Sequence, residues 1–282
     1  MRDRLLSLHP APLLALALPL TGCQALLSLR EVVEGALEPF ALQSTHIGVV
    51  PSEDQRIADA LAGSEYASGV LVRTWVYDTR AGGAPGGLKP EFAGLASGGS
   101  LPMQEDPEGE GFRLDGEDGA RFTPGDEVEV QVVYEEEPRW LRVVSPEAPA
   151  VAISEFHGAG EELPVSLAGQ DFVRALVLVI DVETSETVWD NLPKSAEDAG
   201  PSSRGPEALE VTVPGDVFSA DRLLAVGVAG ADEAGPGDYA AVNTAVSGFT
   251  AARFVFQTVC TFEDPDLCDP EPVEGEEPAP QP

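Results

Sequence analysis

Residues 127–134 read Glu-Val-Glu-Val-Gln-Val-Val-Tyr, and their alternation of polar and apolar side chains decides the class of the fold. Successive side chains of a β-strand point to opposite faces, so alternate valines share one face while the polar residues between them share the other. The preceding residues 122–126, Phe-Thr-Pro-Gly-Asp, are typical of a turn. This stretch therefore predicts a strand with one buried and one solvated face.

Segments of similar character recur along most of the chain and are separated by turns. The 282 residues include 29 glycines and 25 prolines, which break helices and favour turns. Residues 175–189 predict one long strand or a hairpin through Thr184-Ser185, and the apolar run from Leu176 to Ile180 indicates burial on both faces. Further strands are expected in segments 69–78, 139–144, 150–156, 163–169, 209–213, 223–229 and 253–259, with two short ones between Glu91 and Met103. Short strands at this spacing are typical of β-sandwiches.

A different, helical pattern precedes the strands. Apolar residues at spacings of three and four predict an amphipathic helix, which acts as a stalk, packs on the domain or binds a partner. These residues are Leu26, Leu29, Val33, Leu37 and Phe40. A second, short helix is expected to begin at Ser52 and to end at Gly63.

The charge of the chain excludes one class of partner. Asp and Glu number 49 against 16 Lys and Arg, which gives a formal net charge of −33. Such a surface repels phosphate groups, so the sequence argues against nucleic-acid binding and against adsorption to anionic lipid headgroups.

The N-terminus has the pattern of an export signal. Arg2 and Arg4 precede the apolar run of residues 11–20. As a helix, residues 11–22 would span about 18 Å at ~1.5 Å per residue, less than the ~30 Å hydrocarbon core of a membrane. A cleaved signal fits this length better than a membrane anchor does.

The end of this run, Leu20-Thr21-Gly22-Cys23, resembles the lipobox of bacterial lipoproteins at all four positions. The resemblance implies diacylglycerol on the Cys23 thiol, cleavage before Cys23 and acylation of the new amino terminus. Several acyl chains on one residue give lasting membrane attachment. Gln24, where aspartate would retain the protein at the inner membrane, implies the outer membrane of a Gram-negative bacterium. A plain signal peptide with a chance cysteine is the alternative.

Residues 213–230, Val-Pro-Gly-Asp-Val-Phe-Ser-Ala-Asp-Arg-Leu-Leu-Ala-Val-Gly-Val-Ala-Gly, resemble the corner before the penultimate strand of fibronectin type III and immunoglobulin-like domains. The resemblance covers residues 150–260 and concerns topology. Leu223 and Leu224 stand where those families carry a corner tyrosine.

These patterns together predict a mainly β chain in which two consecutive β-sandwich domains, immunoglobulin-like or fibronectin type III-like, follow a short helical segment. The expected parts are a lipoprotein signal peptide at 1–22, a lipid-anchored helical segment at 23–64, a first β-sandwich at 65–147, a second β-sandwich at 148–262 and a disordered acidic, proline-rich tail at 263–282. Residues 146–149, Pro-Glu-Ala-Pro, are the expected linker.

Three cysteines in an exported chain leave one unpaired. With lipid on Cys23, Cys260 and Cys268 remain as a pair, and an oxidising compartment allows a disulfide between them. A metal site is the rival, but two cysteines without a nearby histidine make a poor zinc site. We therefore expect the disulfide.

One acidic, glycine-rich segment, residues 105–119, is a candidate metal site. Asp115, Glu117 and Asp118 supply carboxylate oxygens, which calcium prefers. The spacing of an EF-hand loop is absent, and a solvated acidic loop is the favoured alternative. No cofactor is expected.

Other signs of chemistry are few. Beyond the signal, only His46 and His157 are available as bases, and no nucleophile or nucleotide-binding motif accompanies them. The three tryptophans, Trp75, Trp140 and Trp189, suit either a sugar-binding face or the core, and the core is favoured because each lies in an expected strand.

We therefore expect a non-enzymatic, lipid-anchored envelope protein that displays β-sandwich modules to an unidentified protein or glycan partner. The first alternative is an accessory subunit of a surface assembly or secretion apparatus. An envelope hydrolase is the second alternative, and it would have to act without a recognisable nucleophile.

Overall fold

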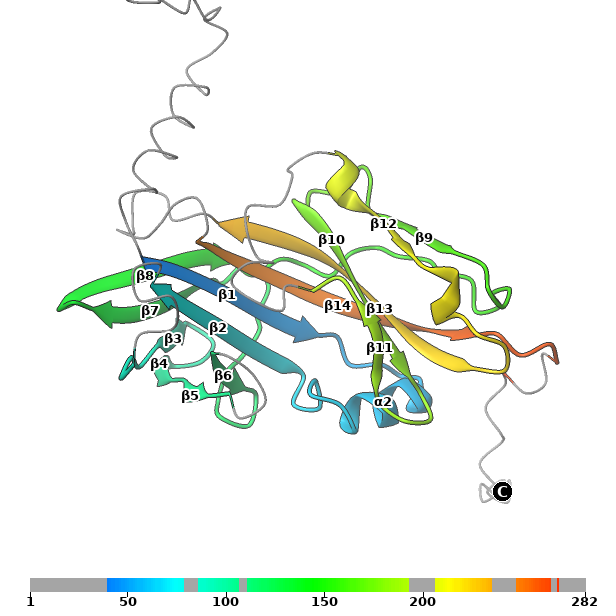
Figure 1. The fold of residues 1–282 in the computed structure, drawn as a ribbon, viewed down its shortest axis with the longest axis horizontal. Coiled ribbons are helices and arrows are strands. Elements are labelled where there is room, and N and C mark those ends of the chain that lie inside the picture. Colours follow the sequence, from blue (N-terminus) through cyan, green and yellow to red (C-terminus); the bar gives the residue numbers. More distant parts are fainter. Residues whose placement is uncertain are drawn as a thin grey trace, which may run out of the picture.

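The computed structural model describes residues 40–78, 86–106, 111–192, 206–234, 247–264 and 268. One long, twisted sheet runs through the whole molecule, and two smaller sheets and a helix cover its faces (Figure 1). The mainly β prediction is confirmed. No helix in the described ranges has the length and apolar character needed to cross a membrane.

The long sheet has eight strands. In spatial order they are β11 (Thr187–Asp190), β10 (Arg174–Asp181), β13 (Leu223–Ala234), β14 (Gly248–Cys260), β1 (Phe40–Val49), β2 (Val70–Asp78), β6 (Phe112–Asp115) and β5 (Gln104–Glu105). Every neighbouring pair is antiparallel except β1 and β14, which are parallel. The sheet therefore combines strands from both ends of the described chain.

β1 occupies the middle of this sheet, between β14 and β2. Its residues from Gln43 to Val49 pair with Gly248 to Phe254 on one side, and β2 follows on the other. The prediction of a helical segment over 23–64 is wrong for this stretch, because its side chains are buried on both faces and its backbone is paired on both edges. The expected amphipathic helix begins in residues that lie outside the described ranges.

A four-stranded sheet covers one end of the long sheet. Its strands, in order, are β4 (Gly99–Pro102), β3 (Glu91–Gly94), β7 (Glu127–Tyr134) and β8 (Glu137–Val144). The alternate valines of β7 are buried in a core with Phe92 of β3 and Leu42 of β1, while its glutamates stay at the surface. The alternation that predicted this strand is thus confirmed.

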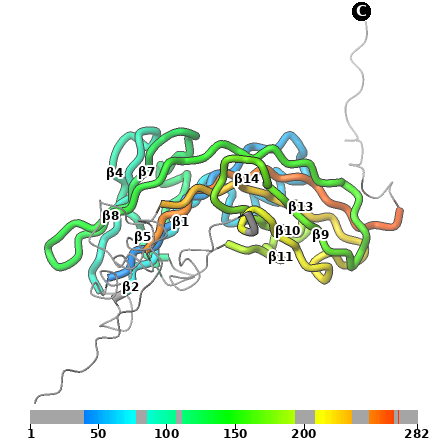
Figure 2. The backbone as a smooth tube through the Cα atoms, turned by 90° about the horizontal axis from the view of Figure 1, so that it is seen from above, coloured from blue at the N-terminus to red at the C-terminus, as the bar shows by residue number. Residues whose placement is uncertain are grey.

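A two-stranded sheet covers the other end of the same face. It consists of β9 (Leu163–Ser166) and β12 (Glu210–Val213), with the short 3₁₀ helices η1 (Pro206–Leu209) and η2 (Gly215–Val217) on either side of β12. Seen from above, β9 and the four-stranded sheet lie at opposite ends of the elongated molecule (Figure 2). The long sheet is therefore one layer of two separate cores.

β10 is buried on both faces, as its apolar run predicted. Val177 and Val179 pack against the β9–β12 sheet, whereas Leu178 and Ile180 pack in the core on the opposite face. A hairpin joins β10 to β11, and Ser185 adopts a left-handed conformation at φ 59° in its turn. The hairpin alternative for residues 175–189 is thus the correct one.

Helix α2 (Gln55–Ala62) covers the opposite face of the long sheet (Figure 1). Ile57, Ala60 and Leu61 form its buried side. Its N-cap is Asp54, two residues after the expected start at Ser52, and Gly63 ends it as expected. The short helix was therefore predicted correctly except for its first turn.

The division into two separate β-sandwiches at residues 147 and 148 is not confirmed, because strands from both halves share the long sheet. The strand expected at 150–156 is wrong, since only Phe156 forms a bridge, to Cys260. Instead the side chain of Gln257 holds this segment. Its Oε1 accepts from the Ile153 N–H at 2.6 Å, and its Nε2 donates to the Val151 carbonyl at 2.9 Å.

Replacing Phe254 by alanine tests the core under α2. Phe254 lies on β14 and is fully buried there. We expect Phe254→Ala to lower the free energy of unfolding by about 3–5 kcal/mol, because the lost contacts leave a cavity. Urea unfolding followed by circular dichroism measures it. Leu95→Ala is the control, because Leu95 is 84% exposed and its loss should change stability by less than about 0.5 kcal/mol.

Candidate functional site

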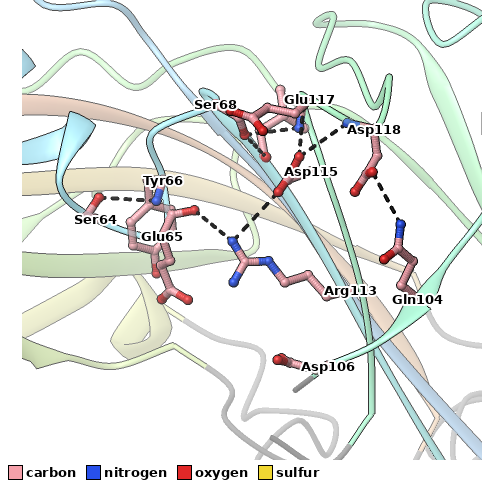
Figure 3. Close-up of polar contacts among 12 residues, drawn as sticks. Ser64, Glu65, Tyr66, Ser68, Gln104, Asp106, Arg113, Asp115, Glu117 and Asp118 are labelled. Carbon is pink, nitrogen blue, oxygen red and sulfur yellow. Dashed lines mark hydrogen bonds and ion pairs between the residues drawn. The ribbon is translucent and has the colours of Figure 1, made fainter. Parts of the chain in front are cut away.

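The expected calcium ligands lie at the end of β6 and in the turn that follows it (Figure 3). Asp115 Oδ1 accepts hydrogen bonds from the backbone N–H groups of Glu117 at 2.8 Å and Asp118 at 3.3 Å. Asp118 Oδ1 accepts instead from Gln104 Nε2 at 3.4 Å. The carboxylates of Asp115 and Asp118 thus have different partners, and Asp115 stabilises its own turn.

Within the described residues, no three His, Cys, Asp or Glu side chains gather closely enough to hold a metal ion. Calcium at Asp115, Glu117 and Asp118 stays a prediction from the sequence, and the observed role of the Asp115 side chain is in the local fold.

Beside this turn, two arginines face each other across β2 and β6. Arg73 and Arg113 are paired in register, and like charges at this distance repel. Glu65 forms an ion pair with Arg73, and the Arg113 guanidinium donates to the Glu65 carbonyl at 3.4 Å. Asp106 lies 3.7 Å from Arg73 Nε. The carboxylates therefore offset the repulsion and hold the edge of the sheet together.

A surface hollow of about 460 Å³ lies between the start of α2, the end of β14 and the segment before β9. It combines apolar side chains with convergent polar ones, as binding sites often do. Its lining residues are Ser52, Asp54, Arg56, Ile57, Ala152, Ile153, Glu155, Phe256, Gln257 and Thr258.

Arg56 is the only cation among the residues that line this hollow. Its Nε donates to Asp54 Oδ1 at 3.0 Å and its Nη2 to Asp54 Oδ2 at 2.7 Å, which is the two-point geometry that arginine forms with carboxylates. Its Nη1 donates to the Cys268 carbonyl, and Glu155 lies 3.7 Å away. Arg56 therefore links the start of α2 to the segment that follows β14.

Asp54 connects the same elements from the other side. Its Oδ1 accepts from the Arg56 backbone N–H at 3.0 Å, and its Oδ2 accepts from Thr258 Oγ1 at 2.6 Å. The hydrogen bonds from the Arg56 side chain lower the pKa of Asp54 to about 2, against the opposing effect of burial. A carboxylate with so low a pKa is a weak base at neutral pH. We call the Asp54–Arg56–Thr258 group with the Cys268 carbonyl the Arg56 clamp.

Cys260 and Cys268 form a disulfide, with their Cα atoms 5.9 Å apart, as the cysteine count predicted. Both residues are buried. The disulfide fixes the position of the Cys268 carbonyl, which the Arg56 clamp uses. Cys23 and the rest of the lipobox lie outside the described residues, so the lipid site stays a prediction.

The two histidines have different surroundings. His46 is fully buried between the rings of Phe92 and Phe122, with Nδ1 3.4 Å from Ser145 Oγ. Burial lowers the pKa of His46 to about 3, although the backbone of Arg121 raises it in part. The Nε2 of His157 lies 2.9 Å from the Glu161 carbonyl oxygen, in the loop before β9.

The three tryptophans divide between core and surface. Trp75 is buried, and Trp189 packs partly buried against the core under β9 and β12. The core prediction is wrong for Trp140, because the alternation of β8 turns Leu141 and Val143 inward and Trp140 outward. That alternation was visible in the sequence, but Arg139, which is buried and faces inward beside the exposed Glu137, obscures it.

Comparison of the chain with protein-family models and with curated proteins finds no significant match.

Acid titration tests the burial of His46. The unfolded chain binds a proton on this ring near pH 6.5, whereas the folded chain does so only near pH 3. Stability from this group is therefore complete above pH 6.5 and is lost as the pH falls toward 3, at up to about 1.4 kcal/mol per pH unit. Urea unfolding at pH 7, 6, 5 and 4 should show a steeper slope in the wild type than in His46→Leu, in which groups such as Asp54 contribute only at the acid end of this range. An equal slope in both would contradict the assignment, and His157→Leu is the control that keeps the slope.

Removal of the Arg56 guanidinium tests the clamp. We expect Arg56→Met to lower the free energy of unfolding by about 1–3 kcal/mol, because Asp54 and the Cys268 carbonyl lose a charged donor. The measurement is urea unfolding at pH 7. The matched control is Arg253→Met, since Arg253 lies 3.8 Å from an exposed Glu147 and such pairs contribute less than about 1 kcal/mol. An equal effect of both substitutions would show that the clamp has no special role.

Proposed function

We propose that the chain is a non-enzymatic, lipid-anchored protein of the cell envelope that displays β-sandwich modules for binding or scaffolding. Leu20, Thr21, Gly22 and Cys23 support the lipid anchor, and Gln24 supports location in the outer membrane of a Gram-negative bacterium. In this proposal, acyl chains on Cys23 hold the β-rich part of the chain at the membrane.

One observation carries the non-enzymatic part of the proposal. The polar groups that converge in the hollow beside α2 are engaged with one another, since Asp54 accepts from both Arg56 and Thr258. A catalytic base needs a pKa near the working pH, and the pKa of Asp54 is far below it. The arrangement thus favours a structural clamp over acid–base chemistry.

The layers of the fold support two modules, although both modules share the long sheet. One core lies between the long sheet and the four-stranded sheet, and another lies between the long sheet and the β9–β12 pair. We take these two layered regions as the counterparts of the modules expected at 65–147 and 148–262. Their immunoglobulin-like or fibronectin type III-like character belongs to the proposal.

A second candidate function, an accessory subunit of a surface assembly, is favoured by one exposed face. Val133 is 57% exposed and Val144 is 48% exposed, and both lie on the outward side of the β7–β8 hairpin together with Trp140. Exposed apolar side chains that share one face are typical of surfaces that contact another molecule.

Metabolic labelling with radioactive palmitate in a Gram-negative host tests the proposal. We expect label on the wild-type chain and none on Cys23→Ser, because the lipid is carried by that thiol. The double variant Cys260→Ser, Cys268→Ser is the control and should keep its label. Label that persists on Cys23→Ser, or a wild-type chain without label, would overturn the proposed anchor.

A further inference from the structure

The outward face of the four-stranded sheet carries an ordered row of side chains. In register, Trp140 of β8 lies opposite Gln131 of β7, which lies opposite Glu91 of β3. Adjacent strands are ~4.8 Å apart, so this row is about 10 Å long. All three side chains lie on the side of the sheet that faces away from the long sheet, because Leu141, Val130 and Phe92 point to the core.

Trp140 presents carbon atoms to the solvent. The residue is partly exposed, but its indole N–H is buried and has no acceptor among the described residues. The exposed part of the side chain is therefore hydrocarbon on a flat, rigid ring. Such a surface is suited to contact with the C–H groups on one face of a pyranose ring.

Gln131 and Glu91 add polar groups to the row. The Gln131 amide makes no hydrogen bond with any other residue in the described ranges, and it offers two donors and an acceptor. Glu91 is exposed, and its Oε2 accepts from the Ser100 hydroxyl. An aromatic ring, an amide and a carboxylate thus lie in line. A saccharide offers complementary groups, because its rings have apolar faces that can stack on the aromatic ring and hydroxyl groups that can bond to the amide and the carboxylate.

We propose that this row is a binding site for a glycan of neutral or amino-bearing sugars, with one pyranose ring on Trp140 and hydroxyl groups on Gln131 and Glu91. The inference deepens the proposed function and rests on its binding role, but it does not depend on the lipid at Cys23. The site consists of strand residues, so its geometry is set by the sheet.

The charge around the row selects the class of sugar. Arg142, the cation next to Trp140, forms an ion pair with Glu129, and Glu127 lies 3.9 Å from it. Three further glutamates are exposed: Glu135 and Glu136 in the turn of the β7–β8 hairpin and Glu137 at the start of β8. Anionic glycans are repelled here, and so is a second copy of a chain with net charge −33. Neutral sugars and amino sugars therefore remain as the candidate ligands of the row.

Isothermal titration of the full chain tests the site, with a detergent that lacks a sugar headgroup. The probes are cellohexaose, chitohexaose and a chitosan hexamer, with a hyaluronan oligosaccharide as the anionic probe. We expect heat with at least one neutral or amino-sugar probe and none with hyaluronan. Trp140→Ala should weaken binding at least about tenfold. Gln131→Ala should weaken it to a smaller extent.

Phe156→Ala is the matched control, since Phe156 is a half-exposed aromatic residue at the other end of the long sheet, and this variant should bind as the wild type does. No heat at millimolar concentrations of any probe would overturn the proposal, as would equal binding by Trp140→Ala. Analytical ultracentrifugation of the full chain tests whether this face binds protein instead of sugar. Self-association or protein binding that Trp140→Ala abolishes, without sugar binding, would make this face a protein interface instead. None of these outcomes affects the palmitate labelling, so the two proposals fail separately.

Discussion

The fold depends on the pairing of β1 with β14 and β2 in the centre of the long sheet. Without β1, the long sheet would separate into two smaller sheets, each with a row of unpaired backbone groups. β1 also carries polar side chains into the interior, where some of their atoms have partners and others, such as His46 Nε2, have none among the described residues. Ser44 Oγ lies 2.9 Å from Thr74 Oγ1, and His46 lies near Ser145. β1 contributes Leu42 to the core beneath the four-stranded sheet and Ile47 to the core beneath α2. Both of these cores therefore rely on this strand.

The strands that local alternation determines were predictable. β7 and β8 alternate in burial along their length, and β10 has the continuous apolar run of a strand buried on both faces. β1 was not predictable in this way, because its central residues Gln43 to His46 are polar and yet buried. Their burial follows from a parallel partner about 205 residues later in the chain, and a local pattern contains no information on such a partner.

The same contrast holds for the candidate sites. The disulfide followed from the number of cysteines, and the outward position of Trp140 was contained in the alternation of β8. The Arg56 clamp was not predictable, since Arg56 and Cys268 are 212 residues apart and meet only in the folded chain. The carboxylates of the acidic loop show the opposite problem, in which the sequence suggests a site that the described structure does not form. Their composition suggested a metal, but the turn directs Asp115 to its own backbone.

From the position of β1 we also expect an order in which the sheets form. The four-stranded sheet is built from residues close in sequence and can form early, because short loops close at low entropic cost. The long sheet cannot be completed until residues 248–254 have been translated, since only they supply the second partner of β1. Contacts of such long sequence separation slow folding, so we expect the pairing of β1 with β14 to be a late step.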